Sequence, residues 1–316
     1  MLFAYTAEGA SLRQLPNGAD LEPALWIDLY RPMPEQIVRV RALGIEVPTL
    51  ADMEEIELSN RLYRENGADY LTVVLPGLSE TKNPISGPVC FILYPGRMVT
   101  VRHHAPRPFE TYPTRAAKVG PGCADPRRMF LSLVEEIVGR LADLLEGAGR
   151  SLDEIGKRVF DYEESDAELS HALRDVSRES DLISKVRLSL LTIERAVSFF
   201  GQSLAEGPGE TLRPFVKGLM RDIQALEVHG DHLTNRIAMT SDLTLGMISV
   251  AQNNTTKTVS VVAVIFLPPT LIASIYGMNF ATMPELSWQW GYPIAVAMMI
   301  GSAAGAYLFF RRKRWL

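Results

Sequence analysis

Cysteine is scarce in this sequence. Cys90 and Cys123 are the only two among 316 residues, and their spacing does not fit a metal knuckle. We expect both to be reduced thiols in a cytoplasmic domain. The N-terminus, Met1 to Tyr5, also lacks the basic and then apolar pattern of a signal peptide, so we expect the soluble part to stay in the cytoplasm.

Positive charge is not in excess, and the motifs of common enzymes are missing. The chain has 32 Lys and Arg against 37 Asp and Glu, a formal net charge of -5, which argues against a nucleic-acid partner. No Walker loop, glycine-rich dinucleotide turn or nucleophile elbow is present. These absences count against a catalytic domain.

Charge is missing altogether from two long apolar runs near the C-terminus. They extend from about Val259 to Tyr276 and from Gly291 to Phe310. Each has roughly the length that a helix needs to cross a hydrocarbon core of about 30 Å. A buried helix of a soluble protein is the alternative, because Gly, Ser and Thr interrupt both runs.

The flanks of these runs favour a membrane hairpin. Lys257 precedes the first run and 311–314 is a basic cluster that closes the second, whereas the loop between them has no Lys or Arg. The positive-inside rule then predicts a multi-pass protein of the inner (plasma) membrane with both termini in the cytoplasm. Trp288, Trp290 and Trp315 suit the interfacial aromatic belts.

The first 125 residues have a mixed α/β pattern. Short β-branched and aromatic runs predict strands at 25–29, 70–75, 89–94 and 98–101. Pro95-Gly96-Arg97 predicts a hairpin between the last two. Helical patterns occupy 34–43 and 49–66, and Thr49 caps the second, with Asp52 three residues on.

Long helices follow. Amphipathic patterns predict helices at 129–160 and 166–200, with a hairpin tip at 161–166 and a glycine-rich break at 201–209. Pro214 suits a helix start, and no further proline occurs before Pro268, so one helix of roughly 65 residues and about 100 Å is expected from about Leu212. A seven-residue repeat on it contains Leu219, Ile223, Leu226, Leu233, Ile237 and Met247.

The predicted fold is an α+β cytoplasmic domain with a long helical stalk and two C-terminal transmembrane helices. Its expected parts are an α/β domain at 1–125, antiparallel cytoplasmic helices at 126–210, a stalk helix at 211–277 with its span at about 258–277, an outer loop at 278–290, a second span at 291–310 and a basic cytoplasmic tail at 311–316.

Small and polar residues follow one face of the long helix. Alternate steps of four and three from Asp242 reach Gly246, Ser249, Asn253, Thr256, Ser260, Ala263, Leu267, Thr270, Ser274 and Gly277, which together form the polar stripe. Polar side chains in a span usually face a bundle interior or a water-filled path. Close helix packing through small residues is the alternative. We favour a pore because the stripe continues beyond the membrane, and one stripe can enclose a pore only in a symmetric ring of subunits.

Three short motifs lie near the C-terminus. They are Tyr276-Gly277-Met278-Asn279, Met283-Pro284-Glu285-Leu286 and Lys313-Arg314-Trp315-Leu316. Together with the two terminal spans, they resemble the CorA family of magnesium transporters. Weaker similarity at 266–270, 251–253, 54–57 and 26–29 extends the resemblance over essentially the whole chain. It implies a homopentamer in which an α/β funnel and stalk helices surround one central pore, with the second spans as an outer ring.

The resemblance also implies site residues. Gly277, Met278 and Asn279 would form the outer selectivity ring, where neutral oxygens accept hydrated Mg²⁺ through its waters. The family's pore positions correspond to Asp242, Asn253 and Thr270, all in the polar stripe. Glu285 in the outer loop either concentrates cations or is a solvated carboxylate without that role.

One pore position departs from the family. Many relatives have a bulky apolar residue where this chain has Thr256, as part of a constriction that closes by dewetting. Val259, Ala263 and Leu267 remain as candidates. We expect the tightest apolar ring at Leu267 or Val259.

The resemblance implies regulation by Mg²⁺ held between cytoplasmic domains by carboxylates, but those ligands do not match residue by residue. Asp222 and Glu227 are candidates, although surface salt bridges explain them as well. Two histidine pairs, His103 with His104 and His229 with His232, lack a convincing third ligand, so packed or solvated imidazoles are favoured over a metal site. Lys257 and the basic cluster fit a regulatory basic ring and lipid headgroup anchoring equally well.

The implied function is uptake of Mg²⁺, with Co²⁺ and Ni²⁺ as further cargo, driven by the membrane potential. Mg²⁺ is then substrate and regulatory ligand, no resident cofactor is expected, and the partners are identical subunits and the lipid bilayer. A Zn²⁺ transporter of the ZntB type is the main alternative, and the intact 277–279 and 283–286 motifs favour magnesium. A membrane-tethered sensor or enzyme is the weaker alternative.

Overall fold

The computed structural model describes residues 1–316 except Ile56, 161–165, 205–210, 279–282, Arg314 and Leu316. The predicted hairpin tip therefore lies outside the described residues apart from Asp166, as does most of the predicted glycine-rich break. The chain separates into two compact units. The first comprises Met1–Arg158 and Arg174–Thr240, and the second comprises Val159–Leu173 and Ser241–Leu316.

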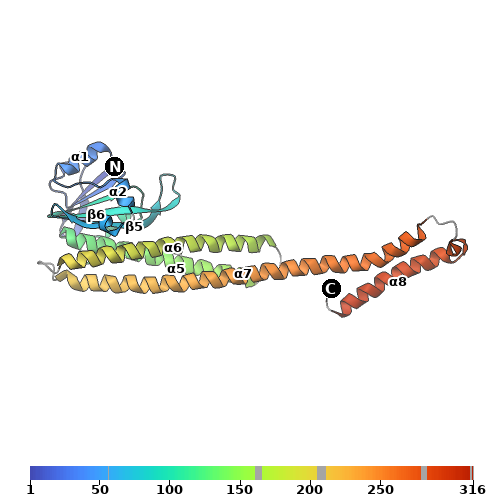
Figure 1. Ribbon diagram of the computed structural model, residues 1–316. Coiled ribbons are helices and arrows are strands. Elements are labelled where there is room, and N and C mark those ends of the chain that lie inside the picture. Colours follow the sequence, from blue (N-terminus) through green and yellow to red (C-terminus); the bar gives the residue numbers. More distant parts are fainter. Residues whose placement is uncertain (56, 161–165, 205–210, 279–282, 314, 316) are drawn as a thin grey trace. The chain divides into compact units, whose positions relative to one another are not determined.

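Within the described residues, the first unit is built on a seven-stranded sheet (Figure 1). Its strands are β1 (Leu2–Glu8), β2 (Ser11–Gln14), β3 (Trp26–Tyr30), β4 (Leu62–Glu65), β5 (Ala68–Leu78), β6 (Pro84–Tyr94) and β7 (Arg97–Arg102), in the order β2-β1-β3-β7-β6-β5-β4. β3 and β7 pair in parallel, with Ile27 opposite Val99. The other neighbours are antiparallel. The four predicted strands are confirmed as β3, β5, β6 and β7, with β5 and β6 each longer than expected.

The predicted hairpin joins β6 to β7. Tyr94 pairs with Arg97, which leaves Pro95 and Gly96 as the two-residue loop. Gly96 has φ of +84°, a conformation that favours glycine. Proline followed by glycine at these positions is typical of a type II turn, so the turn chemistry fixes the register of the hairpin.

The helix predicted at 49–66 is wrong. This segment contains α2 (Leu50–Glu54), α3 (Leu58–Arg61) and then β4. The cap itself is confirmed, because the Asp52 amide donates to the Thr49 hydroxyl at 3.3 Å and the Thr49 amide donates to the Asp52 carboxylate at 2.8 Å. Pairing of β4 with β5 stacks Tyr63 on Tyr70, with ring centroids 4.5 Å apart. This non-local pairing overrides the local helical pattern.

Helices cover both faces of the sheet (Figure 1). One face carries a core with Ile27, Leu29 and Val99, near α1 (Pro34–Arg41) and α2. The other face meets α4 (Pro108–Arg115), α5 (Pro126–Phe160) and α6 (Asp166–Ser203). An aromatic cluster fills that second interface, and it contains Trp26, Phe91, Phe109, Phe130 and Phe200. The predicted helices at 34–43, 129–160 and 166–200 are thus confirmed, with boundaries shifted by a few residues.

A buried ion pair joins the two parallel strands. Arg102 Nη2 lies 2.8 Å from Asp28 Oδ2, and the two side chains are only 5% and 3% exposed. The Thr100 hydroxyl donates to Asp28 at 2.8 Å and accepts from Trp26 Nε1 at 3.0 Å. The Tyr30 ring lies 4.5 Å from the guanidinium carbon. Both buried charges are therefore compensated.

Two glycines make room for a buried imidazole. The ring of His104 is buried and its Nε2 lies 2.9 Å from the Leu75 carbonyl oxygen. Burial lowers the pKa of His104 to about 4, so the ring is neutral at pH 7 and donates this hydrogen bond. A Cβ on Gly87 would lie 2.9 Å from the ring, and one on Gly77 would lie 2.8 Å from the backbone of Ala105. His104 is a packed histidine, as expected.

We therefore expect Gly77→Ala to destabilise the first unit by roughly 1–3 kcal/mol, because the new Cβ would clash with backbone atoms of Ala105, which cannot rotate away as a side chain could. Gly147→Ala in α5 is the control, since a Cβ there meets no atom within 4 Å. It should be neutral or stabilise by up to about 1 kcal/mol. Scanning calorimetry of the purified chain measures both, and equal melting temperatures would contradict the steric argument.

The continuous helix predicted from about residue 212 is present as α7 (Arg213–Tyr276). It has 64 residues, which corresponds to about 96 Å. Pro268 and Pro269 lie inside it and have no amide hydrogen, so the carbonyl oxygens of Val264 and Ile265 lack their usual donors. Of the seven-residue repeat, Leu219, Ile223 and Leu233 are buried and the other members are half-buried. After α7 come η3 (Pro284–Ser287) and α8 (Gly291–Arg312).

Candidate functional site

The apolar parts of α7 and α8 are almost entirely exposed in the single chain. Phe266 is 66% exposed and Leu308 is 60% exposed. A core helix of a soluble protein would be buried, so that alternative does not fit the structure. Uncovered apolar surface of this extent calls for lipid or further protein subunits.

In the second unit, α8 runs back beside the C-terminal part of α7 (Figure 1). Val261 of α7 and Ala295 of α8 are buried there. The Lys257 ammonium lies 5.6 Å from the centroid of the Trp315 ring, which in turn stacks on Phe310 at 5.7 Å. Lys257 precedes the apolar part of α7 and Trp315 follows α8, so the two helices form an antiparallel hairpin.

The polar stripe is exposed along its whole length, from Asp242 to Gly277. The proposed constriction residues Val259 and Leu267 are 64% and 65% exposed, whereas Val261 on another face is fully buried. The stripe is therefore available to line a path. Apolar residues of α7 outside the stripe, such as Phe266 and Leu271, are exposed as well.

Hydroxyl groups of the stripe donate to the helix backbone. The hydrogen bonds run from Ser249 to the Leu245 carbonyl at 3.1 Å, from Ser260 to the Thr256 carbonyl at 2.8 Å and from Thr270 to the Phe266 carbonyl at 2.7 Å. Each hydroxyl uses its one hydrogen in this way, and its oxygen keeps acceptor capacity. These side chains consequently offer oxygen lone pairs to water.

The outer end of α7 leads into the candidate selectivity motif. The Gly277 amide donates to Ala273 at 2.9 Å and the Met278 amide to Ile275 at 3.3 Å, so the helical path continues briefly past Tyr276. Met278 is 47% exposed. Asn279 lies outside the described residues. Glu285 belongs to η3, and its ring role stays a prediction.

The candidate regulatory acids lie on α7 in the first unit. Asp222 is exposed and lines a hollow of about 260 Å³ together with Glu135. Glu227 is half-buried, and burial raises its pKa, with nearby Glu194 and Asp231 adding to the effect. Within the part of the chain that the structure describes, no three or more His, Cys, Asp or Glu side chains gather as metal ligands. A regulatory role for Asp222 and Glu227 stays a prediction.

The histidine pair of α7 and the two cysteines lie apart from the polar stripe. The His229 and His232 rings lie 6.4 Å apart on α7, and no third ligand joins them among the described residues. Cys90 and Cys123 are free and buried. Burial raises the pKa of the Cys90 thiol to about 12, which keeps it protonated.

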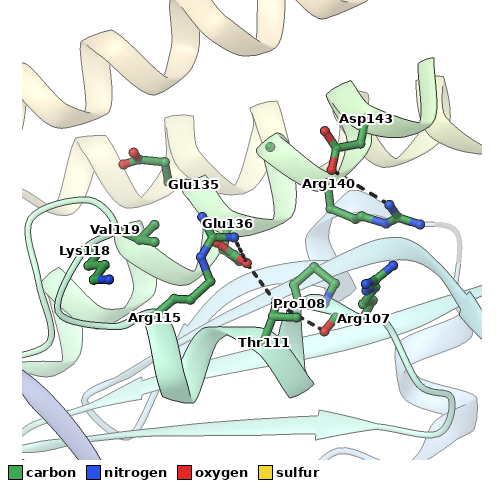
Figure 2. Close-up of a pocket in the computed structure, with 11 residues that line it drawn as sticks. Arg107, Pro108, Thr111, Arg115, Lys118, Val119, Glu135, Glu136, Arg140 and Asp143 are labelled. Carbon is green, nitrogen blue, oxygen red and sulfur yellow. Dashed lines mark hydrogen bonds and ion pairs between the residues drawn. The ribbon is translucent and has the colours of Figure 1, made fainter. Parts of the chain in front are cut away.

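A charged cavity was missed by the sequence reasoning. It has a volume of about 490 Å³ and lies between α4 with the turn after it and α5 (Figure 2). Figure 2 shows Arg115 and Lys118 at one end of the group of lining residues and Arg107 and Arg140 at the other. Arg107 caps α4, Arg115 ends it and Lys118 follows it, so no single helical spacing reveals the set.

Comparison with known proteins gives a match over nearly the full length. A family model described as "CorA-like Mg2+ transporter protein" matches residues 22–312. The magnesium transport protein CorA of Haemophilus ducreyi is 33% identical over 321 residues, covering all of both chains. The solved CorA magnesium transporter of Methanocaldococcus jannaschii has a TM-score of 0.69 at 18% identity, covering 100% of this chain and 99% of that one.

A second solved structure is similar to a large part of the chain. The ZntB cytoplasmic domain of Vibrio parahaemolyticus has a TM-score of 0.55 at 14% identity and covers 77% of this chain and 96% of its own. At such identity the likeness concerns the fold alone. The ion that passes is therefore a question for the sequence relatives and for measurement.

Proposed function

Because the chain belongs to the family of CorA-like Mg²⁺ transporters, which are transporters and not enzymes, we propose that it is the subunit of a homopentameric Mg²⁺ uptake channel. The membrane potential drives the ion inward, and Co²⁺ and Ni²⁺ are further cargo. The observation that carries the proposal is the exposed polar stripe, which runs along α7 to Gly277 at the start of the family motif. Five copies of that stripe, facing one axis, form the wall of a pore.

The chemistry of the stripe suits a hydrated divalent cation. Mg²⁺ holds its water shell tightly, so a pore that carries it must accept the water hydrogens. The oxygens of Ser249, Ser260 and Thr270 supply such acceptors because their hydrogens are donated to the helix. The Asn253 and Thr256 side chains are exposed on the same face and extend the polar path inward to Asp242.

Selection takes place at the outer end of this path. A ring of five Asn279 amide oxygens, with Gly277 and Met278 shaping the ring, accepts hydrogen bonds from the waters around Mg²⁺. Neutral oxygens attract the hydrated ion without holding it as strongly as carboxylates would. Glu285 in the outer loop adds a ring of negative charge that raises the local cation concentration.

Closure of the proposed pore requires a ring of apolar side chains along the same path. Val259 and Leu267 are large apolar residues with exposed side chains, Leu267 within the polar stripe and Val259 directly before Ser260 of the stripe. A ring of five leucines or valines dewets when it narrows, which blocks an ion that keeps its water. We place the gate at Leu267 or Val259 on this basis.

The hairpin of α7 and α8 also supports the proposed topology. Lys257 and Trp315 lie together at the hairpin's open end, next to the basic cluster, whereas the loop lacks Lys and Arg. The positive-inside rule assigns that open end, and with it both termini, to the cytoplasmic side of the inner membrane.

Flux measurement tests the proposal. The protein is reconstituted in liposomes, and entry of Mg²⁺ and Zn²⁺ is followed with ion-specific dyes, with and without a negative-inside potential and a pH gradient. We expect the rate of Mg²⁺ entry to increase with the membrane potential and to be independent of the pH gradient. Zn²⁺ movement that follows the pH gradient, with little Mg²⁺ flux, would instead assign the chain to the zinc-transporting branch.

A further inference from the structure

The charged cavity between α4 and α5 is bordered by four cationic side chains and three carboxylates. Figure 2 shows the cations at separate points of the rim, and they are Arg107, Arg115, Lys118 and Arg140. The acids are Glu135, Glu136 and Asp143. The cavity lies entirely within the first unit, so it is distinct from the polar stripe in the second unit.

Two of the three carboxylates already have cationic partners. Arg115 Nη1 lies 2.8 Å from Glu136 Oε1, which also accepts from the Thr111 hydroxyl at 2.8 Å. Arg140 Nη1 lies 3.8 Å from Asp143 Oδ2, at the outer limit of an ion pair. These contacts neutralise the acids where the cavity wall is formed, and they orient the two arginines along it.

The remaining two cations have no such partner. Arg107 and Lys118 are exposed, and neither side chain makes an ion pair or a hydrogen bond with the part of the chain that the structure describes. Partial burial raises the pKa of the third acid, Glu135, and this carboxylate makes no ion pair with either cation among the described residues. The Arg107 and Lys118 side chains are therefore available to donate hydrogen bonds to an anion in the cavity.

A second, more apolar cavity adjoins the first. It has a volume of about 790 Å³, and Arg107 and Arg140 border both cavities. Its apolar lining comes from Leu78, Leu144 and Leu182, on β5, α5 and α6. Its other cations pair with acids, Lys185 with Asp181 at 2.6 Å and Arg178 with Asp175 at 3.3 Å, and Glu110 and Glu179 border it as well. A ligand that spans both cavities would have an anionic end and a less polar end.

We propose that the two cavities together bind an organic phosphate of the nucleotide class, with its phosphate groups at Arg107, Lys118, Arg115 and Arg140 and its organic part against the leucines of the neighbouring cavity. Guanidinium and ammonium groups at several points favour a phosphate chain over a single carboxylate, since each phosphate offers several oxygens. Each cavity falls within the usual size range of small-molecule sites.

Binding to the purified full-length protein tests this assignment. Isothermal titration in detergent and Mg²⁺-free buffer is carried out with ATP, with inorganic tripolyphosphate and with adenosine. We expect ATP to bind more tightly than tripolyphosphate, and adenosine to bind most weakly. Tripolyphosphate binding as tightly as ATP would overturn the role of the apolar cavity, and no binding of either phosphate would overturn the site.

Substitutions in each cavity test the contributions of the charged cavity and the apolar cavity to binding separately. Arg107→Gln combined with Lys118→Gln should weaken both ATP and tripolyphosphate by at least about tenfold, through loss of charge-assisted hydrogen bonds. Leu78→Gln, at a residue 44% exposed, should weaken ATP alone.

The control is Arg127→Gln with Lys157→Gln, two exposed residues of α5 outside the cavity, which removes the same charges. Equal loss of ATP binding in the control would show that the effect is only one of net charge and would overturn the site. Melting temperatures of all variants are measured in parallel. Because the substituted side chains are exposed, we expect these temperatures to stay unchanged, so that lost binding cannot be attributed to unfolding.

Discussion

Asn279→Ala is expected to abolish Mg²⁺ uptake while the oligomer stays assembled. In a pentamer this change removes five amide oxygens from the proposed selectivity ring at once, and the alanine methyl group cannot accept a hydrogen bond from the waters of the ion. Uptake into liposomes under a negative-inside potential is the measurement. Size-exclusion chromatography or cross-linking of the same preparation reports assembly.

The matched control is Asn235→Ala on α7. Asn235 is exposed in the first unit and lies outside the polar stripe, so transport should stay near the level of the unmodified protein. Retained uptake by the Asn279 variant would remove this residue from the selectivity role and leave the family assignment intact. Loss of uptake in both variants would show that the assay responds to general damage.

Arg102→Met is expected to have the largest effect on stability. It leaves the Asp28 carboxylate, only 3% exposed, without its buried cation, and breaking such a pair costs about 3–5 kcal/mol. For a unit of this size the change corresponds to a fall of roughly 6–20 °C in melting temperature. Differential scanning fluorimetry of the full chain is the measurement.

An exposed ion pair serves as the control. Arg13 and Glu8 lie 2.6 Å apart with side chains 64% and 55% exposed, so Arg13→Met should cost less than about 1 kcal/mol. If both variants melted alike, the Asp28 pair would not be a principal support of the sheet. The contrast holds because burial, more than distance, decides the energetic effect of losing one partner.

Local patterns in the sequence predict the elements that are long and strongly periodic. The 3.6-residue period predicts α5, α6 and α7 to within a few residues, and absence of charge predicts the hairpin of α7 and α8. Local patterns do not predict β4, because its pairing with β5 decides its conformation. The strands β1 and β2 were missed as well, since the edge strand β2 has only four residues and alternating burial is weak in both.

Local sequence patterns likewise predict some of the candidate sites and not others. Positions of the polar stripe follow from helical spacing, and the structure leaves all of them exposed. The Asp28 and Arg102 pair joins residues 74 apart in the sequence, and it exists because β3 and β7 pair in parallel. The charged cavity likewise needs α4 and α5 to meet. Contacts of this kind depend on tertiary structure, so local sequence patterns do not predict them.

The paired prolines give α7 a mechanical property. With two consecutive backbone hydrogen bonds missing, the helix has its lowest bending stiffness at Pro268 and Pro269, close to Leu267. A change in the direction of α7 within the second unit is therefore easiest at this point, beside Leu267.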